Sequence, residues 1–172
     1  MSIEINKLSN ANVYIDGTSL LGRVKEAELP EVMQKMVEHS ALGMIGVVEF
    51  PAGFEKMEGK ISWNSFYKDA FLKVSDHSKT FKVQLRGNLE TYNSDDKQGE
   101  VSYVVYMNIR FKKAPTGNFK QHENVELESE FACYSIKVEV DGTEILEFDP
   151  MANIYRVNGV DKMATYRANI GG

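Results

Sequence analysis

The residues that could do chemistry in this sequence are few and widely separated. The three histidines, His39, His77 and His122, do not form a His-Glu-x-x-His frame, the spacing typical of one class of zinc site. Cys133 is the only cysteine, so an internal disulfide is excluded. Its alternation with Phe131 is typical of a small buried residue in a strand. The sequence contains no Gly-x-Ser-x-Gly motif and no phosphate-binding loop ending in Lys-Ser or Lys-Thr.

Two aspartates stand in a repeated Asp-Gly-Thr sequence, and paired aspartates can exchange protons when they lie close together. Both follow an alternating stretch rich in β-branched residues. Asp-Gly favours type I′ turns, in which both central residues take positive φ. We therefore interpret Asp16-Gly17 and Asp141-Gly142 as hairpin turns.

Three glutamates, Glu126, Glu128 and Glu130, recur at every second position, which places their carboxylates on one face of a strand. Such a row could hold a hard cation such as Ca²⁺, but a solvated strand face is the better supported interpretation. The sequence indicates no cofactor, no metal and no catalytic set. It favours a structural or interaction role over an enzyme.

The length of 172 residues predicts a single domain. The net charge of −5 argues against a broad nucleic-acid-binding surface, which needs clustered Lys and Arg. The N-terminus lacks the pattern of a secretory signal. The longest apolar run, residues 41–48, is far shorter than the roughly 20 residues that span a bilayer. We therefore expect a soluble protein made in the cytoplasm.

Period-two patterns predict a mainly β fold (α+β) with antiparallel strands. Apolar and polar residues alternate over 81–90 and 101–111, and the polar stretch between them predicts a turn. A third strand begins at Val125, and its alternation changes phase at Tyr134-Ser135. A β-bulge there would bend the strand and let it cross between two sheets, as in a sandwich.

One face of these strands is polar along its length, which is typical of a soluble sandwich and also of the lining of a water-filled tube. The candidates for a lumen-facing surface are Lys82, Gln84, Arg86, Asn88, Glu90, Glu126, Glu128 and Glu130.

One packed helix is predicted over residues 64–76, with Asn64-Ser65 as its cap, and a shorter helical turn after Asp161. Residues 29–48 are ambiguous, because their apolar spacing favours a helix but also tolerates a strand.

An apolar, glycine-rich segment covers residues 41–53, and such a segment needs another surface to cover it. The candidate contact residues in it are Ala41, Leu42, Gly43, Met44, Ile45, Val47, Val48 and Phe50.

Four motifs in this order resemble the major tail tube proteins of contractile-tailed temperate phages and R-type pyocins. The first is the opening stretch over residues 12–22. The second and third are Leu29-Pro30-Glu31-Val32-x-x-Lys35 and Ala41-x-Gly43-Met44. The C-terminal motif runs Asp141-Gly142-x-Glu144-x-x-Glu147-x-Asp149-Pro150, then Val157-Asn158-Gly159-Val160-Asp161 and Arg167-x-Asn169-Ile170-Gly171. The motif turns are Asp16-Gly17, Asp141-Gly142 and Asn158-Gly159.

This resemblance implies a single tail-tube domain, residues 1–172, with a barrel-like sheet, a helix packed outside it and a long extended loop. The implied loop covers residues 41–59, and terminal arms cover 1–11 and 160–172. Family members form hexameric rings that stack helically into a hollow tube, and the loop reaches the adjoining ring. The resemblance therefore favours an extended conformation over a helix for residues 33–48.

The implied function is that of the inner tube of a contractile phage tail or a phage-derived bacteriocin. Contraction of a sheath drives such a tube through a cell envelope, and in a phage the lumen conducts DNA without binding it specifically. The implied partners are further copies of the chain, the tail sheath, the baseplate, the tail terminator and the tape measure protein. The implied location is the virion tail or bacteriocin particle, assembled in the host cytoplasm.

Two alternatives stay open from the sequence. One is a type VI-like secretion tube subunit, and the other is a monomeric β-sandwich that binds a ligand through the glutamate row. The sequence does not distinguish a phage from a bacteriocin.

Overall fold

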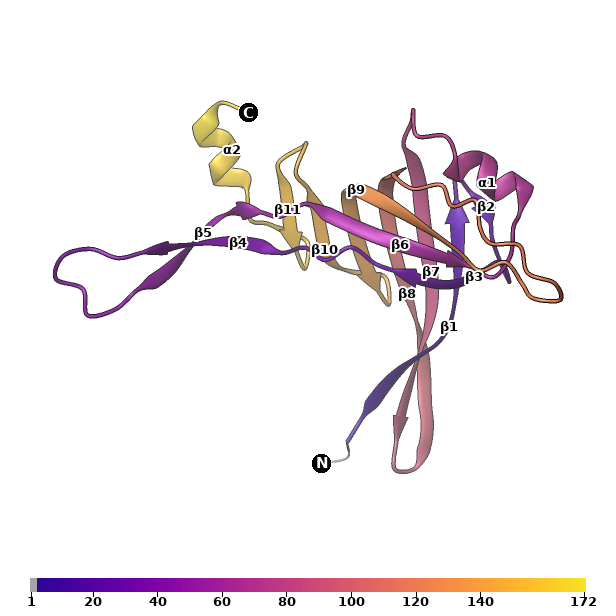
Figure 1. Ribbon diagram of the computed structural model, residues 1–172. Coiled ribbons are helices and arrows are strands. Elements are labelled where there is room, and N and C mark those ends of the chain that lie inside the picture. Colours follow the sequence, from indigo (N-terminus) through magenta and orange to yellow (C-terminus); the bar gives the residue numbers. More distant parts are fainter. Residues whose placement is uncertain (1–2) are drawn as a thin grey trace.

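A computed structural model describes residues 3–172 and shows a protein built mainly from antiparallel strands (Figure 1). Over these residues ten strands form one sheet: β1 (Ile5–Ile15), β2 (Thr18–Ser19), β3 (Val24–Glu28), β6 (Met57–Trp63), β7 (Phe81–Asn93), β8 (Asp96–Phe111), β9 (Leu127–Val140), β10 (Thr143–Asp149), β11 (Ile154–Val157) and β12 (Val160–Asp161). The remaining elements are the strand pair β4 (Gln34–His39) and β5 (Val48–Phe54), and the helices α1 (Lys68–Val74) and α2 (Ala164–Ile170).

The predicted antiparallel pair forms the centre of the sheet. β7 and β8 are neighbours, with Val83 opposite Met107 and Leu85 opposite Val105. Their apolar side chains lie on one face because alternate residues of a strand point to opposite sides. The main path of the sheet runs β2-β1-β7-β8-β9-β10-β11-β12, and this order confirms the mainly β prediction.

β9 bends where the sequence changes phase. Asn108 of β8 lies opposite Ser135, but Ile109 lies opposite Cys133, so Tyr134 is the extra residue of a bulge. Before the bulge the other edge of β9 pairs with β6, and after it with β10. The predicted bulge is confirmed. The predicted crossing between two sheets is not found in residues 3–172, because β6 and β10 belong to the same ten-stranded sheet and β9 only changes its partner within it.

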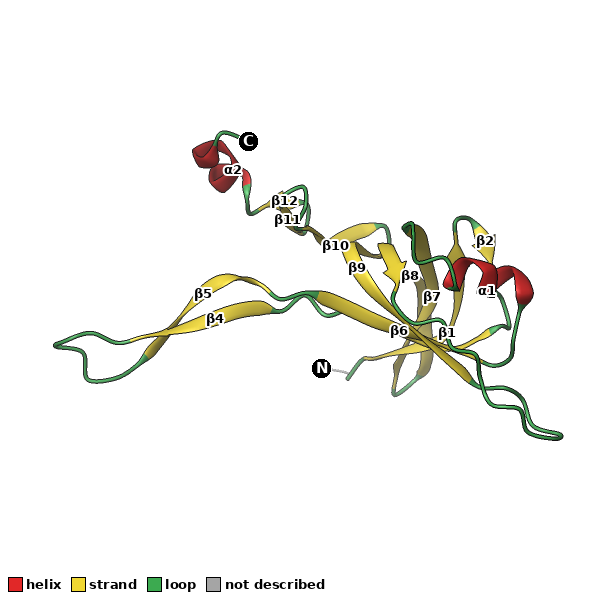
Figure 2. Cartoon of the chain, turned by 45° about the horizontal axis from the view of Figure 1, so that its top comes forward, coloured by secondary structure: helices red, strands yellow, loops and turns green. Residues whose placement is uncertain are grey.

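The six strands β1, β7, β8, β9, β6 and β3 wrap around the core in that order (Figure 2). Trp63, Phe111 and Phe131 are fully buried inside this wall. The indole nitrogen of Trp63 donates a 2.9 Å hydrogen bond to Ser129 Oγ, so the polar atom of the largest core side chain is satisfied. No ladder joins β3 to β1 within the described residues, and the barrel is therefore open along one seam.

Helix α1 packs on this core, but the predicted cap is wrong. Ala70, Phe71 and Val74 are its buried residues, and the Phe71 ring lies 5.4 Å from the Trp63 ring. The helix begins at Lys68 and ends at Val74, inside the predicted span 64–76. Asn64 does not cap it, because its amide donates to Gly22 O at 2.7 Å and its Oδ1 accepts from the Tyr67 hydroxyl.

Residues 29–48 contain no helix, so the interpretation favoured by apolar spacing alone is wrong. Residues 34–39 form β4, with Val37 opposite Phe50 of β5, and the extended conformation implied by the family resemblance is confirmed. Cross-strand contacts within the hairpin outweigh the helical periodicity here.

The two ends of the chain differ from the predicted arms. Residues 5–11 of the N-terminal segment pair with β7, from Ile5 opposite Tyr92 to Ala11 opposite Gly87, so they are part of the sheet. Met1 and Ser2 lie outside the described residues. At the other end α2 follows β12 as the predicted helical turn, and it buries none of its residues. No helix in residues 3–172 is long and apolar enough to cross a membrane.

Candidate assembly surfaces

A two-stranded hairpin, β4 and β5 with the loop 40–47, projects away from the sheet (Figures 1 and 2). Its base is fixed by a hydrogen bond from the Glu55 amide to Met33 O, and by Phe54, whose ring packs 4.6 Å from Phe148. The observed projection and the predicted loop 41–59 have different bounds at both ends. The projection begins earlier because β4 is one of its strands, and residues 57–59 are part of β6 instead. Met57 is buried there, and Gly59 lies against the Phe131 ring.

The tip of the hairpin is apolar and faces solvent. Leu42 and Ile45 are fully exposed, and Gly43 makes the bend with φ of 90°. All eight predicted contact residues are exposed: Ala41, Leu42, Gly43, Met44, Ile45, Val47, Val48 and Phe50. Exposed apolar patches of this kind mark interaction surfaces in soluble proteins.

The two faces of the hairpin differ in chemistry. Val37 and Phe50 form an opposed pair on one face, followed by His39 opposite Val48. The other face carries the carboxylates of Glu38 and Glu49 (both in exposed positions). An assembly partner can therefore contact an apolar side and an acidic side separately.

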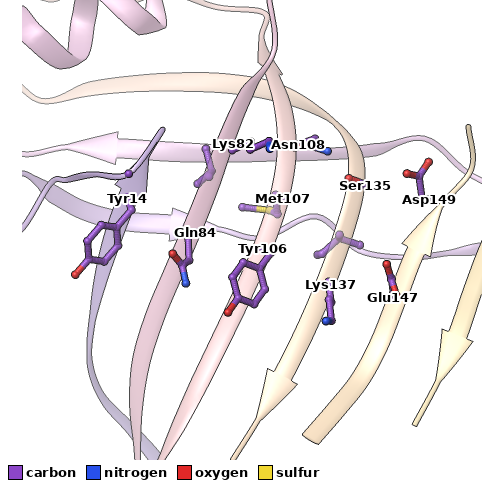
Figure 3. A pocket seen from close by; sticks show the side chains of 13 residues that line it. Tyr14, Lys82, Gln84, Tyr106, Met107, Asn108, Ser135, Lys137, Glu147 and Asp149 are labelled. Atoms are coloured by element: carbon purple, nitrogen blue, oxygen red, sulfur yellow. The ribbon is translucent and has the colours of Figure 1, made fainter. Parts of the chain in front are cut away.

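The polar face of the main sheet forms a second candidate surface. One transverse row crosses seven strands in register and consists of Tyr14, Gln84, Tyr106, Lys137, Glu147, Arg156 and Asp161. Figure 3 shows the side chains of this row from β1 to β10 next to one another over a shallow hollow of about 500 Å³. The predicted residues of β7 on this face are Lys82, Gln84, Arg86, Asn88 and Glu90.

Many cations on this polar face are neutralised within the same subunit. Lys137 Nζ lies 2.7 Å from Glu139 Oε1, and this bond raises the pKa of the lysine. Arg156 lies 2.7 Å from Glu147. Lys97 is in turn bound to Glu90 at 2.9 Å. These three pairs leave Lys82 and Arg86 of β7 as cations of this face without an ion pair within the described residues.

The glutamate row lies elsewhere on the barrel. Glu128 and Glu130 lie opposite Ser62 and Lys60 of β6, in the half of β9 that precedes the bulge. The structure therefore does not bring this row together with the β7 row.

Each glutamate of the row has a lysine partner. Lys25 binds Glu126 at 2.6 Å and lowers the pKa of that carboxyl. Lys113 lies 3.3 Å from Glu130 and 3.7 Å from Glu128. Across residues 3–172, no three His, Cys, Asp or Glu side chains are grouped so that they could hold a metal ion.

The predicted turns have the expected backbone. φ is 48° and 76° at Asp16-Gly17, 50° and 72° at Asp141-Gly142, and 50° and 74° at Asn158-Gly159. Positive φ at both central residues is the type I′ signature, so the turn interpretation is confirmed. Asp16 Oδ1 also accepts a hydrogen bond from the Lys82 amide at 3.0 Å, which ties the first turn to β7.

One surface was not predicted from the sequence. A groove of about 310 Å³ lies along the open seam between β1 and β3, and its lining includes Ala11, Gly22, Ala27 and Gly87. These small residues are scattered through the chain, and only the wrapping of the sheet brings them together.

Comparisons with known proteins identify relatives that match nearly the whole chain. A family described as phage tail tube protein FII matches residues 5–171. The tail tube protein of Escherichia phage P2 is 29% identical over 167 residues, which cover 96% of each chain.

Two solved structures share the fold, and both come from an extracellular contractile injection system in its extended state. The PVC sheath/tube terminator matches with a TM-score of 0.58 and 8% identity, over 77% of this chain and 95% of that one. A chain of the PVC sheath-tube complex matches with a TM-score of 0.55 and 7% identity, over 76% of this chain and 88% of that one. At these identities the likeness shows the fold alone. The family match, by contrast, spans nearly the whole sequence, and the chain therefore belongs to the phage tail tube protein FII family, as a structural tail tube protein rather than an enzyme.

Proposed function

We propose that this chain forms closed rings, hexameric as the family resemblance implies, which stack into the inner tube of a contractile phage tail or tail-like particle. The observation that carries the proposal is the β4–β5 hairpin. Its tip exposes Leu42 and Ile45 fully, and it projects away from its own sheet (Figure 2). An apolar tip held away from its own core is suited to bury itself in another copy.

The open edges of the sheet support ring closure. β12 ends one side of the main path and β2 ends the other, and both strands are two residues long. Pairing or packing of one copy beside the next would cover these edges, and closed rings leave no edge exposed.

The polar face supports a role as the lumen surface. Its transverse row ends in Arg156 and Asp161, and Arg167 of α2 is bound to that aspartate. Lys97, Lys137 and Arg156 have acidic partners in the same subunit, whereas Lys82 and Arg86 form no ion pair within the described residues. The face would therefore offer only part of its cations to the phosphates of passing DNA. DNA transit without specific binding is therefore the proposed role of this face in a phage.

The proposed partners of the ring are further copies on either side and the tail sheath around it. Baseplate, tail terminator and tape measure proteins would contact the ends and the lumen of the same tube. Assembly in the host cytoplasm belongs to the same proposal.

A pair of charge substitutions tests the proposal. Ile45→Asp places a charge at the hairpin tip and is expected to abolish sedimentable polymers while the circular dichroism spectrum stays unchanged. Leu72→Asp is the matched control, because Leu72 is an exposed apolar residue on α1, outside the hairpin. Normal polymers from the Ile45→Asp variant would show that the hairpin does not join the rings.

A further inference from the structure

The seam of the barrel is bordered by two strand edges without ladder partners. Over the described chain β3 pairs with β6 alone, and β1 pairs with β2 only through Tyr14 and Ile15. The edges of residues 8–12 and 24–27 therefore border the groove without a ladder partner, and the Ala11 amide donates to Asn10 Oδ1 at 2.8 Å. Unpaired edges of this kind readily accept another chain.

The wall of the groove is mostly apolar, with Asn10 and Asn12 among its polar members. Ala11 is exposed although it lies on the same face of β1 as buried Val13, and the residue opposite it is Gly87. Ala27 lies opposite buried Ile61 and is itself half-buried. Ala11 and Ala27 leave open the space that larger side chains would fill, whereas the space over Gly87 is taken by Leu8, whose Cδ1 would lie 2.6 Å from a Cβ there.

Only two charged residues line the groove, Lys25 and Glu26, and both are exposed. Lys25 is already bound to Glu126. The groove therefore offers no unpaired buried charge to a ligand. Its chemistry fits an uncharged apolar segment with a free backbone.

The hairpin tip has matching properties. Residues 40–48 contain no charged side chain, and Leu42 and Ile45 project from them fully exposed. The groove volume of about 310 Å³ equals roughly ten waters at ~30 Å³ each, enough for a few aliphatic side chains. The hairpin points away from the seam of its own chain, so this tip serves a different molecule (Figure 1).

We propose that the groove between β1 and β3 receives the hairpin tip of a second copy of this chain. The two patches are different surfaces of one molecule, so the contact is heterologous and propagates from copy to copy instead of closing a dimer. This inference rests on the proposed stacking of rings and names the receiving surface on the adjoining ring.

Disulfide trapping between two pools of protein tests the inference. One pool carries Ile45→Cys and the other Ala11→Cys, and the two are mixed, assembled on tail baseplates and oxidised. A disulfide needs Cβ atoms roughly 3.5–4.5 Å apart, so it reports direct contact. We expect a product of roughly twice the chain mass in the mixture, with a 45–11 linkage by peptide mass spectrometry. Ala27→Cys replaces Ala11→Cys if that variant does not fold.

The control variant is Ser102→Cys, an exposed residue on the polar face of the same sheet. It is expected to give no linkage to position 45. Polymers that form normally but show no linkage from position 45 to 11 or 27 would overturn the receiving groove and leave the tube function standing. Failure of the unsubstituted chain to assemble on baseplates would contradict the tube function and this inference together.

Discussion

Glu38 of β4 lies directly opposite Glu49 of β5 in the projecting hairpin, and both side chains are exposed. Like charges directly opposite each other in antiparallel strands are destabilising. Apart from its base, the hairpin is a two-stranded ribbon, and such ribbons are only marginally stable in water. The hairpin is therefore a weakly stabilised part of the free subunit, and contact with a neighbouring copy is expected to stabilise it.

Reversal of one of these charges should stabilise the free hairpin. Glu49→Lys converts the repulsion into an ion pair worth about 0.2–1 kcal/mol. Amide hydrogen exchange of residues 34–39 and 48–54 should slow in the unassembled variant. Glu49→Gln should give a smaller effect, and added salt should reduce the difference between the variants because it screens exposed charges. Equal exchange in all three proteins would contradict the account.

The buried hydrogen bond from Trp63 to Ser129 should be a large contributor to stability. Ser129 Oγ also lies 3.3 Å from Ile61 O, so both ends of the hydroxyl are engaged in the core. Ser129→Ala leaves the indole N–H buried without a partner, at a cost of about 1–3 kcal/mol. Urea unfolding followed by the fluorescence of the single tryptophan measures the loss. Ser62→Ala, on the opposite face of β6, should stay within about 0.5 kcal/mol of the parent protein.

Gly59 should tolerate no larger residue. A Cβ there would lie 2.4 Å from Phe131 Cζ and 2.6 Å from Glu28 O, and the second of these atoms is backbone. Gly59→Ala is therefore expected to lower the free energy of unfolding by about 1–3 kcal/mol through overpacking. Gly99→Ala is the strand control, since a Cβ at that position meets nothing within 4 Å. A lower melting temperature for the Gly99 variant than for the Gly59 variant would refute the packing argument.

The Cys133 thiol should be unreactive while the protein is folded. Burial raises the pKa of this thiol to about 12, and the thiolate is the reactive species. Iodoacetamide should label it slowly at pH 8 in buffer and rapidly in denaturant, where the pKa returns to about 8.5.

The raised pKa also links stability to pH. Because the folded pKa exceeds the unfolded one, the contribution of the protonated thiol is full below about pH 8.5 and is lost as the pH rises toward 12. Rapid labelling of Cys133 in the folded protein would contradict its burial in β9.

Much of the fold followed from side-chain alternation. The pairing of β7 with β8 and the bulge at Tyr134 were both predictable. The first is indicated by alternating apolar residues in both strands, and the second by a change in the phase of that alternation within β9. The helix that apolar spacing alone favoured for residues 29–48 is absent for a related reason. Val37 and Phe50 stabilise each other across the hairpin, and a single-segment periodicity contains no information about that partner.

The candidate surfaces also fall into two groups, those visible in a single segment of sequence and those that form only when several strands meet. The exposed hairpin residues could be predicted because an apolar, glycine-rich run is visible in one segment. The groove could not, because Ala11, Ala27 and Gly87 come from three strands that meet only when the sheet wraps around its core. The separation of Glu128 from the polar residues of β7 could not be predicted from the sequence either, because it depends on the change of partner along β9 from β6 to β10.

Electron microscopy of the concentrated protein, alone and with tail baseplates added, tests the central claim most directly. The account predicts hollow filaments of stacked rings, with the polar face of β7 and β8 lining the channel. A protein that stays monomeric under both conditions, as judged by sedimentation of the same samples, would contradict it.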